Sequence, residues 1–328
     1  MNVPAWTVGV VFASVPLVAV GASADEAPPL GVPAWLYPIN PPAGLQPRSF
    51  DDRVPLRLPG APRSFTERGL NDLFAAPDWR PATHTPMPAI VAKGRAPQVN
   101  ACGFCHSPSG QGRPENASLA GLPRDYILEQ LAAFRAGERR SGWPGRYVPT
   151  DRMIAGVATL QDPEAVAAAD YFSSQVLHRR VRVRETREVG TPSVSGWVYR
   201  LNATHREPLG ERILEEDPDL ARHERRDDTL VYTAWVPVGS VARGRRLATV
   251  GRGAAQPACM SCHGPGLRGN GLIPPLAGHS PTYLARQLFA FKVGTRCNPG
   301  ASPMRTVAQG LSTGDIIATA AFAGSLSP

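Results

Sequence analysis

The chain has 328 residues, a formal net charge of +8, an apolar content of 42% and a charged content of 19%. These values allow two or three domains and are ordinary for a folded globular protein, which argues against an intrinsically disordered chain. The five cysteines do not require a disulfide framework, because four of them fall into two Cys-x-x-Cys pairs.

An apolar run at residues 8–20 precedes a small-x-small pattern at residues 22–24. This combination is typical of a secretory signal peptide. No Lys or Arg stands ahead of the run, so an uncleaved anchor is the alternative, although Pro16 and the short run argue against a spanning helix. We expect a signal peptide at residues 1–24, a mature chain starting near Asp25, and membrane association only if this segment is not cleaved.

Residues 25–84 form an N-terminal extension rich in proline, with Trp35 and Tyr37 among the prolines. Proline fixes φ and removes an amide donor, so this composition predicts extended backbone rather than helix. Aromatic residues are rare in disordered segments, which indicates a strap lying across a folded domain. His84, at the end of the extension, is expected to face water rather than to bind a metal.

The pentapeptide Cys-x-x-Cys-His occurs twice, at residues 102–106 and 259–263. This spacing is the attachment site of a c-type haem. Two thiols three positions apart can add to the two vinyl groups of one porphyrin, and the adjacent imidazole can bind the iron as its fifth ligand. The sequence therefore predicts two covalently attached haem c groups. The attachment residues are Cys102, Cys105, Cys259 and Cys262, and the iron ligands are His106 and His263.

The sequence around the two motifs repeats at an offset of 157 residues without a gap. The repeat extends well beyond the haem peptides, so it supports a duplication independently of them. Upstream, residues 91–95 match residues 241–245, with seven more residues before the first cysteine of the second copy. We therefore expect two copies of one domain, at residues 85–175 and 238–328. Besides the motif, the matched residues are Leu119-Ala120-Gly121 with Leu276-Ala277-Gly278, and Tyr126, Gln130, Leu131, Phe134 and Gly137 with Tyr283, Gln287, Leu288, Phe291 and Gly294.

The same helical pattern is visible in both copies. Apolar residues at i, i+4 and i+7 followed by glycine predict amphipathic helices over residues 127–137 and 284–294. Their apolar faces are expected to pack on the porphyrin. The last helix of each copy is predicted to begin at Asp162-Pro163-Glu164 and at the capping box Ser312-x-x-Asp315.

One methionine follows each haem peptide at a similar distance. Met153 lies 47 residues after His106, and Met304 lies 41 residues after His263. A thioether fills the sixth coordination position of the iron and raises its reduction potential, which suits an electron carrier. A methionine can also be a flexible core filler, but the recurrence at corresponding places favours ligation. Met153 and Met304 are therefore the predicted sixth ligands.

Between the two copies, residues 176–237 differ in character. Alternating apolar and polar residues near Val181 and Tyr232 predict strands, and so a small β-containing insertion. Two roles are open for it, fixing the separation of the domains or binding a partner. The arginines between residues 179 and 187 alternate with valine rather than with stacking aromatic residues, so nucleic-acid binding is not expected.

On these motifs the sequence resembles the class I cytochromes c, specifically tandem members with one compact domain per haem, over residues 85–175 and 238–326. The resemblance implies a mainly α fold of two cytochrome c domains, joined here by the β-containing insertion and preceded by the Pro-rich strap. It also implies His/Met-ligated iron, electron transfer and a periplasmic location. Two features depart from the family. One is the long insertion, and the other is Cys297, seven residues before Met304, where the first copy has Arg140.

The resemblance leaves two classes of function. As a carrier, the protein would pass electrons between redox partner proteins and would have no catalytic residues. As an enzyme, it would be a di-haem peroxidase or another haem oxidoreductase with one open haem or one ligated by Cys297. The matched methionines and the close repeat favour the carrier.

Charge adds an expectation about redox partners. The propionates of two haems remove several positive charges, so the surface is only mildly basic and suits weak, salt-sensitive encounters with an acidic protein. Arg135 and Arg146 are candidates to pair with the propionates.

Overall fold

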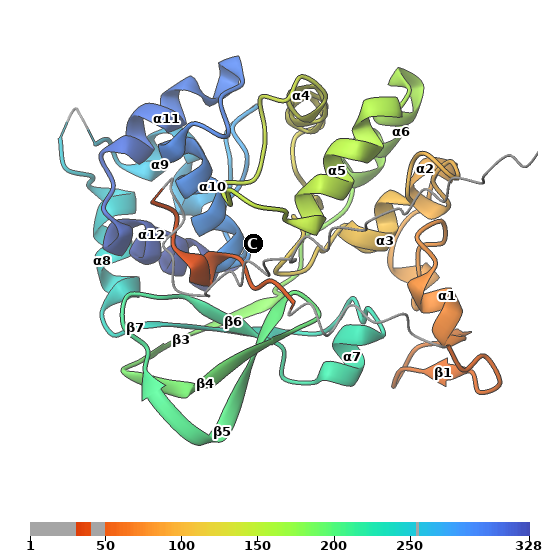
Figure 1. Ribbon diagram of the computed structural model, residues 1–328. Helices are drawn as coiled ribbons and strands as arrows, with labels where there is room; N and C mark the ends of the chain where they lie inside the picture. Colours follow the sequence, from red (N-terminus) through yellow and green to blue (C-terminus); the bar gives the residue numbers. More distant parts are fainter. Residues whose placement is uncertain (1–30, 41–49, 254–255) are drawn as a thin grey trace, which may run out of the picture.

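The computed structural model describes residues 31–40, 50–253 and 256–328. The expected signal peptide and part of the Pro-rich extension lie outside the described residues. Two groups of helices stand side by side above a β-sheet (Figure 1). Among the described residues, no helix combines the length and the apolar character needed to cross a membrane.

The first group of helices contains the first haem peptide. Its elements are α2 (Ala89–Ala92), α3 (Cys102–His106), α4 (Arg124–Arg135), α5 (Val148–Thr159) and α6 (Asp162–Ser173). Helix α4, which carries the predicted apolar stripe, contacts both α5 and α6. The N-cap of α6 is Gln161 rather than Asp162, because the Gln161 amide donates to the Glu164 carboxylate at 2.8 Å. The helix therefore begins at Asp162, but the N-cap expected at Asp162 is wrong by one residue.

The second group repeats this order. It contains α8 (Ser240–Thr249), α9 (Cys259–His263), η4 (Pro265–Leu267), α10 (Pro281–Val293), η5 (Pro299–Ala301), α11 (Ser302–Gln309) and α12 (Thr313–Ser325). The predicted capping box of Ser312 and Asp315 is present at the start of α12. Helices α8 and α12 cross closely at Gly244, where an added Cβ would lie 2.0 Å from the Ala318 carbonyl oxygen. Only glycine fits this crossing.

The structure corrects the upstream part of the repeat. The amide of Arg95 donates to the Val99 carbonyl oxygen at 2.7 Å, and that of Arg252 donates to the Gln256 carbonyl oxygen at the same distance. Arg95 and Arg252 are separated by the same offset as the two haem peptides, so the ungapped repeat continues here. The sequence match of Arg95 with Arg245 is therefore wrong, and the additional residues lie further upstream, in the longer helix α8.

The insertion folds as a five-stranded sheet in the order β3-β7-β6-β5-β4. Its elements are β3 (Val181–Thr186), β4 (Glu188–Ser195), β5 (Val198–Pro208), β6 (Leu214–Glu216), α7 (Leu220–Glu224) and β7 (Tyr232–Pro237). Strands β3 and β7, which are parallel neighbours, were predicted from alternation, whereas the antiparallel hairpin β4–β5 was not. Val181, Ala234 and Val236 share one apolar core with residues of α10 and α12, so the sheet packs on the second group of helices.

A buried carboxylate strengthens the contact between this sheet and the second group. Glu215 on β6 is 2% exposed and accepts hydrogen bonds from the Ser280 hydroxyl at 2.6 Å and the Thr282 hydroxyl at 2.7 Å. Both donors stand at the first turn of α10. The insertion therefore holds the N-terminus of the helix that carries the second apolar stripe.

The N-terminal extension lies against both groups, as a strap would. It contains η1 (Ala34–Leu36), β1 (Leu56–Arg57), β2 (Ser64–Phe65), α1 (Glu67–Asn71) and η3 (Pro81–Thr83). The Tyr37 ring packs edge-on against Tyr147, with centroids 4.9 Å apart, in the loop before α5. The Leu36 carbonyl oxygen accepts a hydrogen bond from Arg286 of α10 at 3.1 Å.

Candidate haem sites

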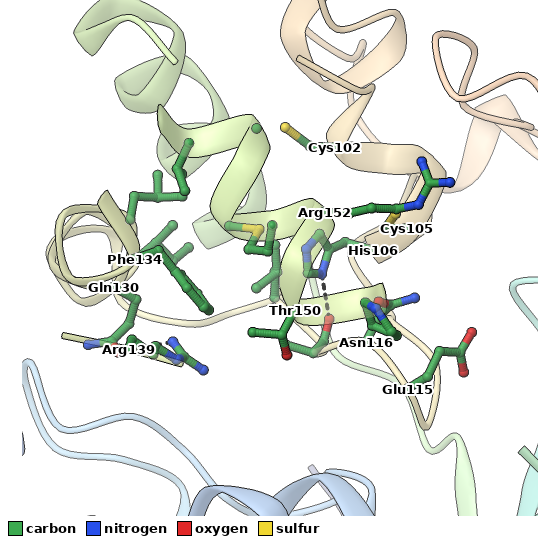
Figure 2. A pocket seen from close by; sticks show the side chains of 18 of the residues that line it. Cys102, Cys105, His106, Glu115, Asn116, Gln130, Phe134, Arg139, Thr150 and Arg152 are labelled. Atoms are coloured by element: carbon green, nitrogen blue, oxygen red, sulfur yellow. Dashed lines mark hydrogen bonds between the residues drawn. The ribbon is translucent and has the colours of Figure 1, made fainter. Parts of the chain in front are cut away.

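The two histidines of the haem peptides are held in the same way. His106 Nδ1 lies 2.8 Å from the Ala117 carbonyl oxygen, and His263 Nδ1 lies 2.9 Å from that of Pro274, the equivalent residue of the second copy. Because a carbonyl only accepts, Nδ1 carries the proton and Nε2 is left with a lone pair. Burial lowers the pKa of both imidazoles, which favours the neutral form that binds iron. Figure 2 shows the bond of His106 at the wall of a pocket.

This pocket in the first domain collects all four residues predicted to attach or ligate the haem of that domain. Cys102, Cys105 and His106 line it from α3, and Met153 lines it from α5. Figure 2 shows the two cysteines and the histidine on the same side of the pocket. Burial raises the pKa of the Cys102 thiol to about 12 and raises that of Cys105, for which the nearby Arg226 is the largest opposing charge. The apolar walls come from α4, α5 and α6 through Ile127, Leu131, Phe134, Val157, Leu160 and Phe172.

Part of the pocket wall is polar and suits the propionates of a haem. Arg139, Arg286 and Tyr147 line it. Tyr147 is 2% exposed, and its hydroxyl has no hydrogen-bond partner among the described residues. Burial raises the pKa of this hydroxyl to about 12, so it remains a donor at neutral pH. A buried donor without a partner beside two guanidinium groups matches the carboxylates of a porphyrin.

The second domain holds its predicted ligands on the equivalent elements. His263 ends α9 and is 7% exposed, while Cys262 is exposed. Cys259 packs on the large core that the second domain shares with the sheet. Met304, on α11, packs in a smaller apolar cluster with Phe291 of α10. Helix α10 contacts α11, so it connects the methionine to the rest of the domain.

Each methionine helix is held at its C-terminus by a cation from the preceding long helix. Arg135 donates to the carbonyl oxygen of Val157, in the last turn of α5, at 3.2 Å, and to that of Leu160, directly after α5, at 2.6 Å. Lys292, its equivalent in the second copy, donates to those of Leu311 at 2.7 Å and Gln309 at 3.0 Å, at the end of α11. The expected pairing of Arg135 with a propionate is therefore wrong. These cations satisfy carbonyls that a helix end leaves unpaired.

Three other expectations from the sequence differ from the structure. Arg146 is exposed and lies 3.8 Å from Asp151, and the described pocket lining does not include it. His84 does not face water, because its ring is bonded to Asp78 at 3.2 Å and to Tyr171 at 3.0 Å, and Asp78 raises its pKa. A lone thiol is expected to be a small buried apolar residue rather than a ligand, but Cys297 is exposed.

The two haem domains meet through a reciprocal contact that the sequence analysis missed. The Arg140 amide donates to the Thr295 carbonyl oxygen, and the Cys297 amide donates to that of Glu138, both at 2.8 Å. Arg140 and Cys297 are equivalent positions of the repeat, and so are Glu138 and Thr295. The contact is therefore an antiparallel bridge centred on Arg139 and Arg296.

The side chains at this bridge follow the same symmetry. Arg139 donates to the Tyr283 hydroxyl at 3.0 Å and to Gln287 at 3.1 Å. Arg296 donates to the Tyr126 hydroxyl and to Gln130, both at 2.7 Å. Both arginines are buried, and burial together with the charge of Arg296 lowers the pKa of Arg139. The repeated Tyr-x-x-x-Gln string was visible in the sequence, but nothing in it showed that the two copies face each other.

Comparison with known proteins gives relatives but no match to a protein-family model. The chain is 27% identical to cytochrome c4 of Azotobacter vinelandii over 243 residues, which cover 73% of this chain and 89% of the relative. It is 28% identical to the thiosulfate dehydrogenase electron acceptor of Thiomonas intermedia over 65% of this chain and 72% of the relative. A segment of 67 residues, 20% of this chain, is 42% identical to cytochrome c-554(548) of Halomonas halodenitrificans and covers 78% of it.

Proposed function

This chain belongs to the tandem di-haem class I cytochromes c, and we propose that it is a periplasmic electron carrier whose two irons are each bound by histidine and methionine. Its family membership means that it binds haem c with iron and exchanges electrons with redox partners. The proposal adds the ligand set, the location and the assignment of one haem to each of residues 85–175 and 238–328.

One observation carries the ligand proposal. Met153 lines the same pocket as Cys102, Cys105 and His106, and it comes from a different helix than they do. Met304 stands on the equivalent helix of the second domain, and a cation holds the end of that helix in both domains. Repetition of the methionine together with its supporting cation is what two ligands held in the same way require.

The haem supplies one-electron redox chemistry, and the chain's own residues decide how it is held. The cysteines fix the porphyrin covalently, and the Nδ1 bonds of His106 and His263 orient the proximal rings. The apolar residues of α4, α5 and α6 exclude water from the first site, which favours electron transfer over ligand exchange.

The lining of the first pocket supports transfer between the two domains. It includes Arg139 and four residues of α10, namely Tyr283, Arg286, Gln287 and Ala290. The first site therefore reaches the second domain directly. The buried guanidinium groups of Arg139 and Arg286, which both line this pocket, would be compensated by propionates.

The ferric protein tests the ligand proposal. With both irons bound by methionine, it should be low-spin and show the far-red methionine-to-iron charge-transfer band for two haems. Met153→Ala or Met304→Ala should each remove half of this band while both haems stay attached. Met87→Ala is the control, because Met87 packs on the same apolar cluster as Met153 but does not line the described pocket. A high-spin site at rest that turns over hydrogen peroxide would favour the enzyme alternative.

A further inference from the structure

The inter-domain insertion places a cation on the first haem peptide. The Arg226 guanidinium lies over the Phe104 ring, with Cζ 3.6 Å from the ring centroid. Phe104 stands between Cys102 and Cys105 and is 5% exposed. Cation–π contacts of this kind are strongest where water is excluded.

Hydrogen bonds fix this arrangement. Arg226 donates to the Phe104 carbonyl oxygen at 3.1 Å and to the Leu70 carbonyl oxygen at 3.0 Å. Its backbone has φ = 56°, in the left-handed region that only a few residues other than glycine adopt, directly after α7. Such a conformation is kept where the surrounding contacts require it. Burial and the neighbouring Arg113 lower the pKa of Arg226 to about 10, which still leaves it charged at neutral pH.

The nearby carboxylates are paired with other cations. Glu115 lies 3.1 Å from Arg113, and Asp227 and Asp228 lie 3.0 Å and 2.7 Å from Arg80. The charge of Arg226 is instead directed to two carbonyl oxygens and an aromatic ring. It therefore acts on the haem peptide as a positive charge in a region of low dielectric.

The second haem peptide has a different environment. The repeat equivalent of Phe104 is Ser261, which is exposed, has no ring and donates its hydroxyl to the Ala258 carbonyl oxygen at 2.7 Å. The equivalents of Arg113 and Glu115 are the neutral residues Asn270 and Leu272, as the matching β-bridges at Arg113 and Asn270 show. Arg113 and Glu115 therefore have no charged counterparts at the equivalent described positions of the second domain.

We infer that Arg226 raises the reduction potential of the haem bound at Cys102 and Cys105, so that the insertion tunes one haem and not the other. Ferric iron carries one more positive charge than ferrous iron, so a fixed cation nearby favours the ferrous state. The inference rests on the proposed electron transfer, but it does not require methionine ligation. Arg226 is a positioning residue in this sense, since it acts through the haem peptide.

A spectroelectrochemical titration of the full-length protein with both haems attached tests this. The titration resolves two one-electron steps. Arg226→Gln should move one step to lower potential, so that the ratio of oxidised to reduced haem at a fixed potential rises on the order of tenfold. Arg226→Lys keeps the charge, so the potential of this step should stay close to the wild-type value. Arg226→Met, uncharged and similar in length, serves if the glutamine variant does not fold.

Arg245→Gln is the matched control for the loss of charge. Arg245 is exposed on α8, and its Cζ lies 6.0 Å from the centroid of the Phe322 ring in the second domain. This variant should move neither step. Titration of Met304→His identifies which step belongs to the second haem, because that step should move. If neither step moves, the proposal of methionine ligation fails. The test of Arg226 still stands, because it does not depend on methionine ligation. The inference is overturned if Arg226→Gln leaves both steps in place, or if it moves the step identified as that of the second haem.

Discussion

With Met304 as the proposed ligand of the second iron, Lys292 should determine how firmly α11 holds that methionine in place. Its ammonium group donates to the carbonyl oxygens of Leu311, Gln309 and Ala308 at 2.7, 3.0 and 3.5 Å. All three carbonyls lie at the end of α11, which carries Met304. Lys292→Gln removes the charge and shortens the reach, so these carbonyls lose their charged donor.

The size of the effect follows from two good hydrogen bonds. A hydrogen bond to a charged group contributes about 1.5–3 kcal/mol, and the favourable interaction of a cation with a helix C-terminus adds about 0.3–1 kcal/mol. Lys292 is partly exposed, which reduces these values. We expect α11 to be destabilised by about 2 kcal/mol, a factor of roughly 30 in the equilibrium for local opening.

The far-red band of the ferric protein is the assay, because under the proposed ligation it reports the methionine–iron bond. On heating, Lys292→Gln should lose half of the band well below the temperature at which far-ultraviolet circular dichroism shows global unfolding. Arg135→Gln should do the same for the first haem. Lys292→Arg should behave like the wild type, since arginine has this role in the first domain.

Lys93 provides the control. It is the other lysine of the chain, it is exposed, and Lys93→Gln makes the same chemical change. The reasoning is refuted if Lys292→Gln and Lys93→Gln lose the band at the same temperature, or if the band in Lys292→Gln disappears only with global unfolding.

Three further outcomes are expected. Gly244→Ala would push a Cβ into the backbone of α12 and should destabilise the protein by about 1–3 kcal/mol, measured as a lower melting temperature. Because the His84 pKa is raised by Asp78, this pair stabilises the fold below about pH 6.5, and the stabilisation should be lost as pH rises through the higher folded pKa. Chemical denaturation at a series of pH values gives the free energy of unfolding. In His84→Gln this free energy should change less with pH than in the wild type. Arg139 and Arg296 both donate to the Gln130 side-chain oxygen and to that of Gln287, so a double-mutant cycle of Arg139→Gln and Arg296→Gln should show a coupling of about 0.5–3 kcal/mol.

The features that the sequence predicted well depend on short-range spacing. Each of these features is defined within a few residues: the two haem peptides, the apolar stripes of α4 and α10, and the capping box of α12. The constant offset of 157 residues then showed that the two copies correspond. The fold class follows from these features. Helix propensity and periodicity are local properties, so they survive in the structure.

The features that were missed depend on contacts between distant residues. His84 looked like a surface residue because its partner Tyr171 is 87 positions away. Arg226 is 122 positions from Phe104. The hairpin β4–β5 was hidden because a bulge between Gly190 and Thr191 interrupts the alternation of its residues. No local pattern contains this information.

The reciprocal bridge between the haem domains has a consequence for how such a molecule can arise. Each side presents the same tyrosine, glutamine and arginine, and each arginine is bound by the tyrosine and glutamine of the other side. A surface of this kind is self-complementary, as in isologous dimers. Two identical single-haem copies bearing these three side chains would make the same pair of contacts across a two-fold axis, before any gene fusion joins them. The fusion then ensures that the partners always meet, and each half becomes free to change its own surroundings.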